Sequence, residues 1–216
     1  MYELVSRGGP VMIPIILASI AGFAVFVARL WTLRRDRVVP RQAFDSVRAL
    51  VAQYRAPEAA AECTMGQSSL ERILATGLHH AGAPRVDIKE RMEEVGRREY
   101  AELSRYVSVV GVVATIEPLL GLLGTVTGMI GVFQGVVGGG VGDPAALASG
   151  IWSALITTAA GLTTGIPAYL GWRYLMAKVD DRMQELEAHA LLVLDMIAGP
   201  DPRQLQYQPY PSGGAR

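Results

Sequence analysis

The sequence predicts an all-α membrane protein with three transmembrane helices, because its charged residues are segregated from three long apolar runs. Residues 106–172 are 67 in number and include only two charged residues, Glu117 and Asp143. Residues 34–105, in contrast, carry 13 basic and 11 acidic side chains. A bilayer core about 30 Å thick needs roughly 20 apolar residues in a helix. Each of the three runs supplies that length.

The first transmembrane helix is predicted over residues 10–31, which read PVMIPIILASIAGFAVFVARLW. It ends beside an arginine and a tryptophan, which are typical of the membrane interface. A cleaved signal peptide is disfavoured, because the strongest positive cluster, Arg34–Arg37, follows the apolar run and no small-residue cleavage site is evident. Residues 1–9 are therefore expected to be a periplasmic amino terminus.

Residues 32–106 are predicted to be a cytoplasmic helical region. Ser68 and Glu71 have the spacing of a capping box, in which each residue satisfies a free backbone amide of a helix start. Asp87 and Glu90 repeat this spacing before a strongly charged helix. We expect that helix to run without interruption into the second transmembrane helix.

The second and third transmembrane helices are predicted over residues 107–137 and 147–175, with a Gly-rich periplasmic loop at 138–146 between them. The third is expected to continue into a cytoplasmic helix at 176–198. Both helices would then extend into a cytoplasmic helical bundle. Residues 199–216 are rich in Pro, Gly and Gln and are predicted to be disordered.

The distribution of Arg and Lys predicts the orientation. Basic residues follow the first and third apolar runs, whereas the connection between the second and third runs has none. Because cytoplasmic loops carry the excess of Arg and Lys, the amino terminus is expected to be periplasmic and the carboxyl terminus cytoplasmic.

Motifs of enzyme and nucleic-acid sites are missing from the sequence. Cys63 is the single cysteine, which excludes an internal disulfide and a cysteine metal cluster. Neither a phosphate-binding glycine loop with lysine nor a GxSxG nucleophile motif occurs. Basic residues are interleaved with nearly equal numbers of acids, which argues against a nucleic-acid surface. We expect no enzyme activity, no cofactor and no bound metal.

A stripe of glycines follows one face of the second transmembrane helix. Their spacings of three and four place them one above another on a helix, at Gly121, Gly124, Gly128, Gly131 and Gly135. Such a stripe lets a neighbouring helix backbone approach closely inside a membrane. Glu117 lies four residues before the first glycine and shares the stripe. Its carboxyl group is therefore expected to face protein or a pore, and not lipid.

The third transmembrane helix carries hydroxyl and small residues on a comparable surface, among them Ser153, Thr157, Thr158 and Gly161. A single Ser or Thr in a helix needs no ligand, because its hydroxyl can bond to the carbonyl four residues earlier. Clustered hydroxyls opposite Thr125 and a carboxyl group favour a different interpretation. They indicate a hydrated ion path through an assembly.

The stretches ATIEPLLGLLGTVTGMIGVF and SGIWSALITTAAGLTTGIPAYLGWRYL closely resemble the two pore-lining helices of the MotA/TolQ/ExbB ion-channel family, in its ExbB/TolQ branch. The resemblance covers about residues 105–175. It implies a homopentamer in the bacterial inner membrane that surrounds the single-span helices of an ExbD/TolR-like partner dimer. It also implies an ion-conducting stator subunit that couples proton or sodium motive force to mechanical work across the periplasm, for example through a TonB-like or other envelope protein.

Within this resemblance, Thr125 and Thr158 match the family's threonines in the two pore-lining helices. A glutamate common in the third helix is replaced by Ser153. Glu117 stands where many relatives have a small apolar residue or serine. We hypothesise that it supplies an inner-side carboxyl for cation release, since removing a carboxyl group from water favours its protonated form.

Three alternatives remain open at this point. Glu117 either supplies the carboxyl group for cation release or pairs with Arg105 or Arg173 of a neighbouring subunit near the inner surface. The ion is either a proton or sodium, because sodium also accepts oxygen ligands. The protein as a whole is either a channel subunit or a non-conducting oligomeric scaffold for a single-span partner among membrane lipids.

Overall fold

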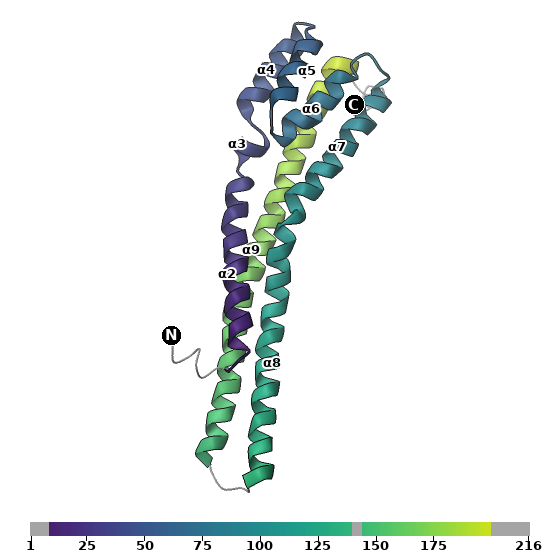
Figure 1. The fold of residues 1–216 in the computed structure, drawn as a ribbon. Helices are drawn as coiled ribbons and strands as arrows, with labels where there is room; N and C mark the ends of the chain where they lie inside the picture. Colours follow the sequence, from purple (N-terminus) through teal and green to yellow (C-terminus); the bar gives the residue numbers. More distant parts are fainter. Residues whose placement is uncertain (1–8, 140–143, 200–216) are drawn as a thin grey trace, which may run out of the picture. The chain divides into compact units, whose positions relative to one another are not determined.

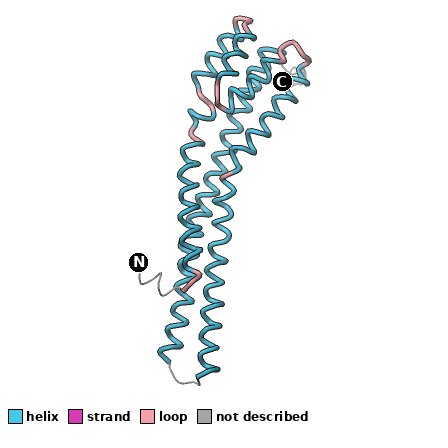
Figure 2. The backbone as a smooth tube through the Cα atoms, viewed as in Figure 1, coloured by secondary structure: helices cyan, strands magenta, loops and turns pink. Residues whose placement is uncertain are grey.

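The computed structural model describes residues 9–139 and 144–199 (Figures 1 and 2). Within these ranges the chain forms α-helices joined by short turns, and they contain no strand. The all-α prediction is thereby confirmed. The predicted periplasmic amino terminus up to residue 8, residues 140–143 of the predicted loop and the predicted disordered tail from residue 200 lie outside the described residues.

The described helices follow one another in the order shown in Figure 1: α2 (Met12–Thr32), α3 (Arg35–Val38), α4 (Arg41–Ala52), α5 (Ala56–Met65), α6 (Ser69–His79), α7 (Arg85–Arg105), α8 (Val107–Gly139) and α9 (Pro144–Ala198). The last helix is continuous over 55 residues. Two compact units share these helices. The three-helix unit comprises α2, α8 and α9 up to Lys178, and the bundle unit comprises α3–α6, α7 up to Glu102 and α9 from Val179.

In the three-helix unit, small residues let α2 approach both other helices. A Cβ placed on Gly22 of α2 would lie 2.9 Å from Cγ1 of Val113 on α8. A Cβ on Gly171 of α9 would lie 3.0 Å from the ring of Phe26 on α2. Larger residues at these two positions would separate the helices. Because both positions are glycine, α2 can pack on α8 and α9 at the same time.

Two described helices are long and apolar enough to cross a membrane, α2 and the part of α8 from Val107 to Gly135. The third predicted span lies in α9, which does not pass that criterion. Its Thr, Gly and Pro residues lower the mean hydropathy of the helix. The count of three transmembrane helices and their boundaries therefore stay predictions.

The bundle unit has a conventional apolar core. Leu70, Leu74, Ile88 and Leu186 are fully buried, and they come from three different helices. The predicted capping box is present at the start of α6, where the Ser68 side chain accepts from the Glu71 amide and the Glu71 carboxylate accepts from the Ser68 amide.

Two predictions about α7 are wrong. The helix starts at Arg85 and not at Asp87, because the carbonyl of Pro84 already accepts from the amides of Asp87 and Ile88. Asp87 thus lies in the first turn, where its negative charge suits the positive end of the helix dipole. The helix also does not continue into α8: it ends at Arg105, and Tyr106 forms a turn before Val107.

Candidate ion pathway and buried acids

At Gly161, the backbone of α9 lies against the backbone of α8. A Cβ built on Gly161 would lie 2.5 Å from the carbonyl oxygen of Glu117 and 3.0 Å from Cα of Gly121. Real side chains do not approach a backbone so closely. Glycine is therefore required at position 161 for the helices to pack at this distance, as its predicted packing role demands.

A hydrogen bond between the two helices lies beside this contact. The Thr158 hydroxyl donates to the carbonyl oxygen of Gly121 at 2.8 Å. One turn away, the methyl group of Thr157 fills the space beside Gly124, whose missing Cβ would lie 2.2 Å from it. The Thr157 hydroxyl donates to the carbonyl oxygen of Ser153 at 2.9 Å. We call this α8–α9 contact, from Glu117 to Gly128 on α8 and from Ser153 to Gly161 on α9, the glycine seam.

The seam does not include the whole predicted glycine stripe. Gly128 packs on Ala154, with 2.9 Å from its missing Cβ to the alanine methyl. Gly131 and Gly135 have no heavy atom of the described chain within 4 Å of that position. The predicted helix-packing role of Gly131 is not seen among the described residues and stays a prediction.

Thr125 and Ser153 lie at the edges of the seam and are half-buried. The Thr125 hydroxyl donates to the carbonyl oxygen of Leu122 at 2.6 Å within its own helix. Helical spacing places Thr125 on the side of Gly121 and Ser153 on the side of Thr157. The structure thus brings the predicted hydroxyl residues to one region of the three-helix unit, while their role in ion passage stays a prediction.

Glu117 is fully buried inside the three-helix unit. Its Oε1 atom lies 2.6 Å from the hydroxyl oxygen of Ser19 on α2. Its Oε2 atom has no hydrogen-bond partner among residues 9–139 and 144–199. Within the chain, the guanidinium groups of Arg105 and Arg173 lie over the rings of Tyr106 and Trp172. A pairing of Glu117 with either arginine of a neighbouring subunit stays a prediction.

Ser19 was missed by the sequence reasoning. It is the one hydroxyl residue in the apolar run from Pro10 to Trp31. A lone hydroxyl in one predicted span and a lone acid in another could have suggested that the two residues pair. Spacing along the sequence does not show this pairing, because 98 residues separate them. Beside this pair lies a cavity of about 370 Å³ between α2, α8 and α9.

In the bundle unit, the buried Glu99 and the half-buried Glu185 both have arginine partners. Glu99 receives two hydrogen bonds from Arg72, each of 2.6 Å. Burial alone would raise the pKa of Glu99, but hydrogen bonds from Arg72 and Ser69 and the charge of Arg72 outweigh it and lower the pKa. Glu185 follows the same pattern: burial opposes the ionised form, and Arg35 with Arg182 lowers its pKa overall.

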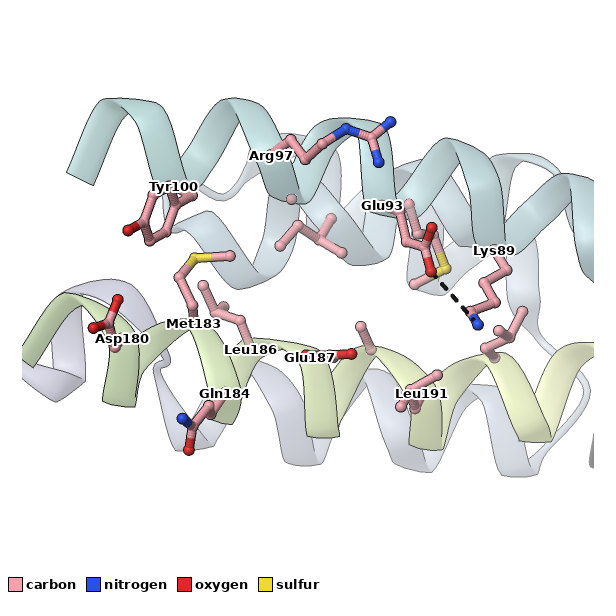
Figure 3. A pocket seen from close by; sticks show the side chains of 15 residues that line it. Lys89, Glu93, Arg97, Tyr100, Asp180, Met183, Gln184, Leu186, Glu187 and Leu191 are labelled. Atoms are coloured by element: carbon pink, nitrogen blue, oxygen red, sulfur yellow. Dashed lines mark ion pairs between the residues drawn. The ribbon is translucent and has the colours of Figure 1, made fainter. Parts of the chain in front are cut away.

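A second cavity, of about 700 Å³, lies in the bundle unit between α7 and α9 (Figure 3). Figure 3 shows side chains of both helices around it, among them Lys89, Glu93 and Tyr100 from α7 and Met183 and Leu186 from α9. The ion pair Lys89–Glu93, at 3.5 Å, lies on its border. The sequence reasoning did not find this cavity, and its lining indicates no particular chemistry.

The remaining reactive side chains have packing roles. Burial, followed by the charges of Glu71 and Glu62, raises the pKa of the Cys63 thiol to about 12, so the group stays protonated. The ring of His189 packs edge-on against Phe44 with 4.2 Å between the centroids. In the part of the chain that the structure describes, His, Cys, Asp and Glu form no group of three or more that could hold a metal ion.

Comparisons with known proteins agree on one family. The model of the MotA/TolQ/ExbB proton channel family matches residues 66–188. A biopolymer transport protein ExbB homolog of Methanothermobacter thermautotrophicus is 30% identical over 188 residues, covering 87% of this chain and 67% of the relative. A biopolymer transport protein ExbB-like 1 of Synechocystis is 33% identical over 190 residues, covering 84% and 73%.

The fold is also similar to that of a chain in the flagellar MotAB stator complex from Bacillus subtilis. The TM-score is 0.54, and the similarity covers 92% of this chain and 81% of the stator chain. Because 20% of the residues are identical, this similarity supports the fold alone.

Proposed function

Since the chain belongs to the MotA/TolQ/ExbB proton channel family, we propose that it is the ion-conducting stator subunit of an ExbB/TolQ-type motor in the bacterial inner membrane. In this proposal five copies surround the single-span helices of an ExbD/TolR-like partner dimer. Ion flow between copies and partner drives mechanical work that reaches the outer membrane, for example through a TonB-like or other envelope protein. The family is a channel family and not an enzyme class.

The observation that carries the proposal is the glycine seam. It holds α8 and α9 at backbone contact and fixes Thr125, Ser153 and the Thr157–Thr158 pair in one region of an otherwise apolar unit. Hydroxyl groups held in place can solvate an ion or order water without a change of structure. The seam therefore supports a path that runs from Thr125 and Ser153 along Thr158 toward Glu117.

The topology of the proposal follows the distribution of charge. The amino terminus and the connection between α8 and α9 are periplasmic, and the bundle unit and the carboxyl terminus are cytoplasmic. The ion is a proton or sodium at the seam. The alternately charged acid of the cycle belongs to the partner's helix, so a subunit without its partner conducts poorly.

A specific observation favours the competing scaffold function. The hydroxyls of Thr157 and Thr158 are both satisfied by backbone carbonyls, which packing alone explains. A Thr158→Val variant would lose an interhelical hydrogen bond as well as a hydroxyl in the path. It therefore cannot separate conduction from assembly.

Thr125 separates the two functions, because its hydroxyl bonds within its own helix. The test compares Thr125→Val with the matched control Thr127→Val, whose hydroxyl also bonds within α8 but lies on another side of the helix. Ion flux is measured in vesicles that carry the chain with its partner, and assembly is measured by native mass spectrometry.

We expect Thr125→Val to lower partner-dependent flux at least tenfold while both variants assemble normally and Thr127→Val conducts as the wild type does. Equal flux in the two variants would remove Thr125 from the path. A wild-type complex that assembles with its partner but passes no ions would establish the scaffold function instead.

A further inference from the structure

The Ser19 hydroxyl faces two oxygen atoms but has one proton to donate. Its oxygen lies 2.8 Å from the carbonyl oxygen of Ile15 and 2.6 Å from Oε1 of Glu117. With Glu117 ionised, Ser19 donates to both oxygen atoms and shares its single proton between them. With Glu117 protonated, Glu117 donates to Ser19 and Ser19 donates to Ile15, so each contact has its own hydrogen. The protonated form therefore satisfies the two contacts better.

The surroundings of Glu117 agree with the neutral form. Its Oε2 atom is buried without a hydrogen-bond partner among the described residues. A buried anionic oxygen without a partner is far more costly than a buried carbonyl oxygen. Glu117 is also the one titratable residue among those that line the adjacent cavity from α2, α8 and α9. Among the residues that the structure describes, none that lines the cavity is a cation that could balance a negative charge.

The geometry points to Glu117 as a proton-binding site inside each subunit, held as a neutral carboxylic acid between α2 and α8. A proton fits this site better than a metal cation, which needs several oxygen ligands. Apart from Glu117, the polar side chains of the lining are Ser19, Thr163 and Thr164, and both threonine hydroxyls donate to carbonyls of their own helix. The rest of the lining is apolar.

The cavity gives a reagent access to this acid. Its volume of about 370 Å³ is within the range of pockets that bind small organic molecules, about 300–1,000 Å³. Phe23, which borders the cavity, is 70% exposed on the chain, so one residue of the lining lies at the surface of the three-helix unit. This site lies inside one subunit, and its protonation does not require ion flow through the glycine seam.

Dicyclohexylcarbodiimide reports a protonated carboxyl group in an apolar site. The carboxyl oxygen attacks the central carbon of the reagent while the carboxyl proton moves to one of its nitrogens. The acyl group then migrates to nitrogen and leaves a stable N-acylurea. No group departs, so the modified peptide gains the whole mass of the reagent.

The first experiment treats membrane vesicles containing the full chain and its partner with this reagent at pH 7, followed by peptide mass spectrometry. We expect labelling of Glu117 and no effect of replacing potassium by sodium. Glu99 serves as the internal control, since it is buried but paired with Arg72 and should stay unlabelled. Protection by sodium, labelling at Glu99 instead, or no labelling of Glu117 would overturn the proposal.

The second experiment does not depend on access of a reagent. Infrared difference spectra of wild type against Glu117→Gln should show the carbonyl band of a protonated carboxylic acid in the wild type at neutral pH, and Ser19→Ala should shift its frequency. Identical spectra for wild type and Glu117→Gln would overturn the proposal. Because neither experiment measures flux, a non-conducting scaffold would give the same result, and the two proposals fail separately.

Discussion

Each of the two units buries a glutamate, and the two glutamates are stabilised in different ways. Glu99 in the bundle unit is 7% exposed and is held by a bidentate arginine. Glu117 in the three-helix unit is fully buried and meets a single hydroxyl group. Burying a charge is tolerated when an opposite charge and hydrogen bonds accompany it, and otherwise a group gives up its charge. The bundle unit thus pairs its buried acid with an arginine, whereas the described residues that line the cavity beside Glu117 include no cation.

The two units also pack their helices in different ways. Leucine and isoleucine side chains fill the core of the bundle unit, where the apolar surface is removed from water. Inside a membrane that driving force is missing between helices, and close backbone contact takes its place. The glycine seam is that contact, and the hydroxyl groups of α9 are fixed by it.

The largest effect is expected from Gly161→Ala. The added methyl group would meet the backbone of Glu117 and Gly121, which cannot move aside without separating the two helices. We expect a loss of about 3 kcal/mol in the free energy of unfolding, measured by thermal unfolding of the detergent-solubilised assembly. Gly131→Ala is the matched control, because open space surrounds that position in the chain. Equal stability of the two variants would contradict the seam.

Glu99→Gln should have the next largest effect. The amide cannot accept both hydrogen bonds of Arg72, so we expect a loss of about 2 kcal/mol, a value typical of hydrogen bonds between charged groups. Thermal unfolding at pH 7 checks this value.

The same pair predicts a pH dependence. The pKa of Glu99 is lowered in the folded chain from its ordinary value of 4.5. Its contribution to stability is therefore fully present above pH 4.5 and is lost as the pH falls through the lowered pKa. The stability difference between wild type and Glu99→Gln should shrink in that acidic range. A difference that stays constant down to the lowest pH measured would show that the arginine pairing is not its source.

Ser19→Ala is expected to cost about 1 kcal/mol, since it removes the hydrogen-bond partner of Oε1 of the buried Glu117. The same thermal assay measures it. The Ser19→Cys variant, which keeps a weak donor, should lie between alanine and the wild type. If the Ser19→Ala variant were as stable as the wild type, the contact between Ser19 and Glu117 would not contribute to the free energy of unfolding.

The smallest effect is expected from Glu117→Gln, at about 0.5 kcal/mol or less. Glutamine has the shape of the protonated acid and can donate to Ser19 in the same way. Thermal unfolding at pH 7 should therefore separate it clearly from Glu99→Gln, although both variants remove a buried carboxyl group. A cost as large as that of Glu99→Gln would mean that Glu117 is ionised and paired in the assembly.

Much of the fold follows from local sequence. The apolar runs and the Ser68–Glu71 spacing predict α2, α8 and the start of α6, because they depend on neighbours within a few residues. The glycine spacing predicts a close contact with another helix, but it does not tell which glycines make that contact within one chain. Gly121 packs on Thr158 of α9, whereas Gly131 has no such contact. The turn at Tyr106 has no proline or glycine beside it, so the local sequence does not predict it.

The candidate site was less predictable. The position of Glu117 on the glycine stripe correctly excluded a lipid-facing acid, since the side chain is buried. Its partner could not be found from spacing, because Ser19 belongs to another helix and the pairing depends on how α2 packs on α8 and α9. The partner of Glu99 could not be found from spacing either, because Arg72 lies 27 positions earlier in the sequence. Contacts of this kind are set by tertiary packing and not by periodicity.

The most direct test of the proposed channel is an image of the intact assembly with its partner, at a resolution that places side chains. The account predicts that the edge of the glycine seam bearing Thr125 and Ser153 faces a water-containing opening around the partner's helix. It would be contradicted if those hydroxyl groups faced the acyl chains, or lay in a dry contact between copies with no central opening.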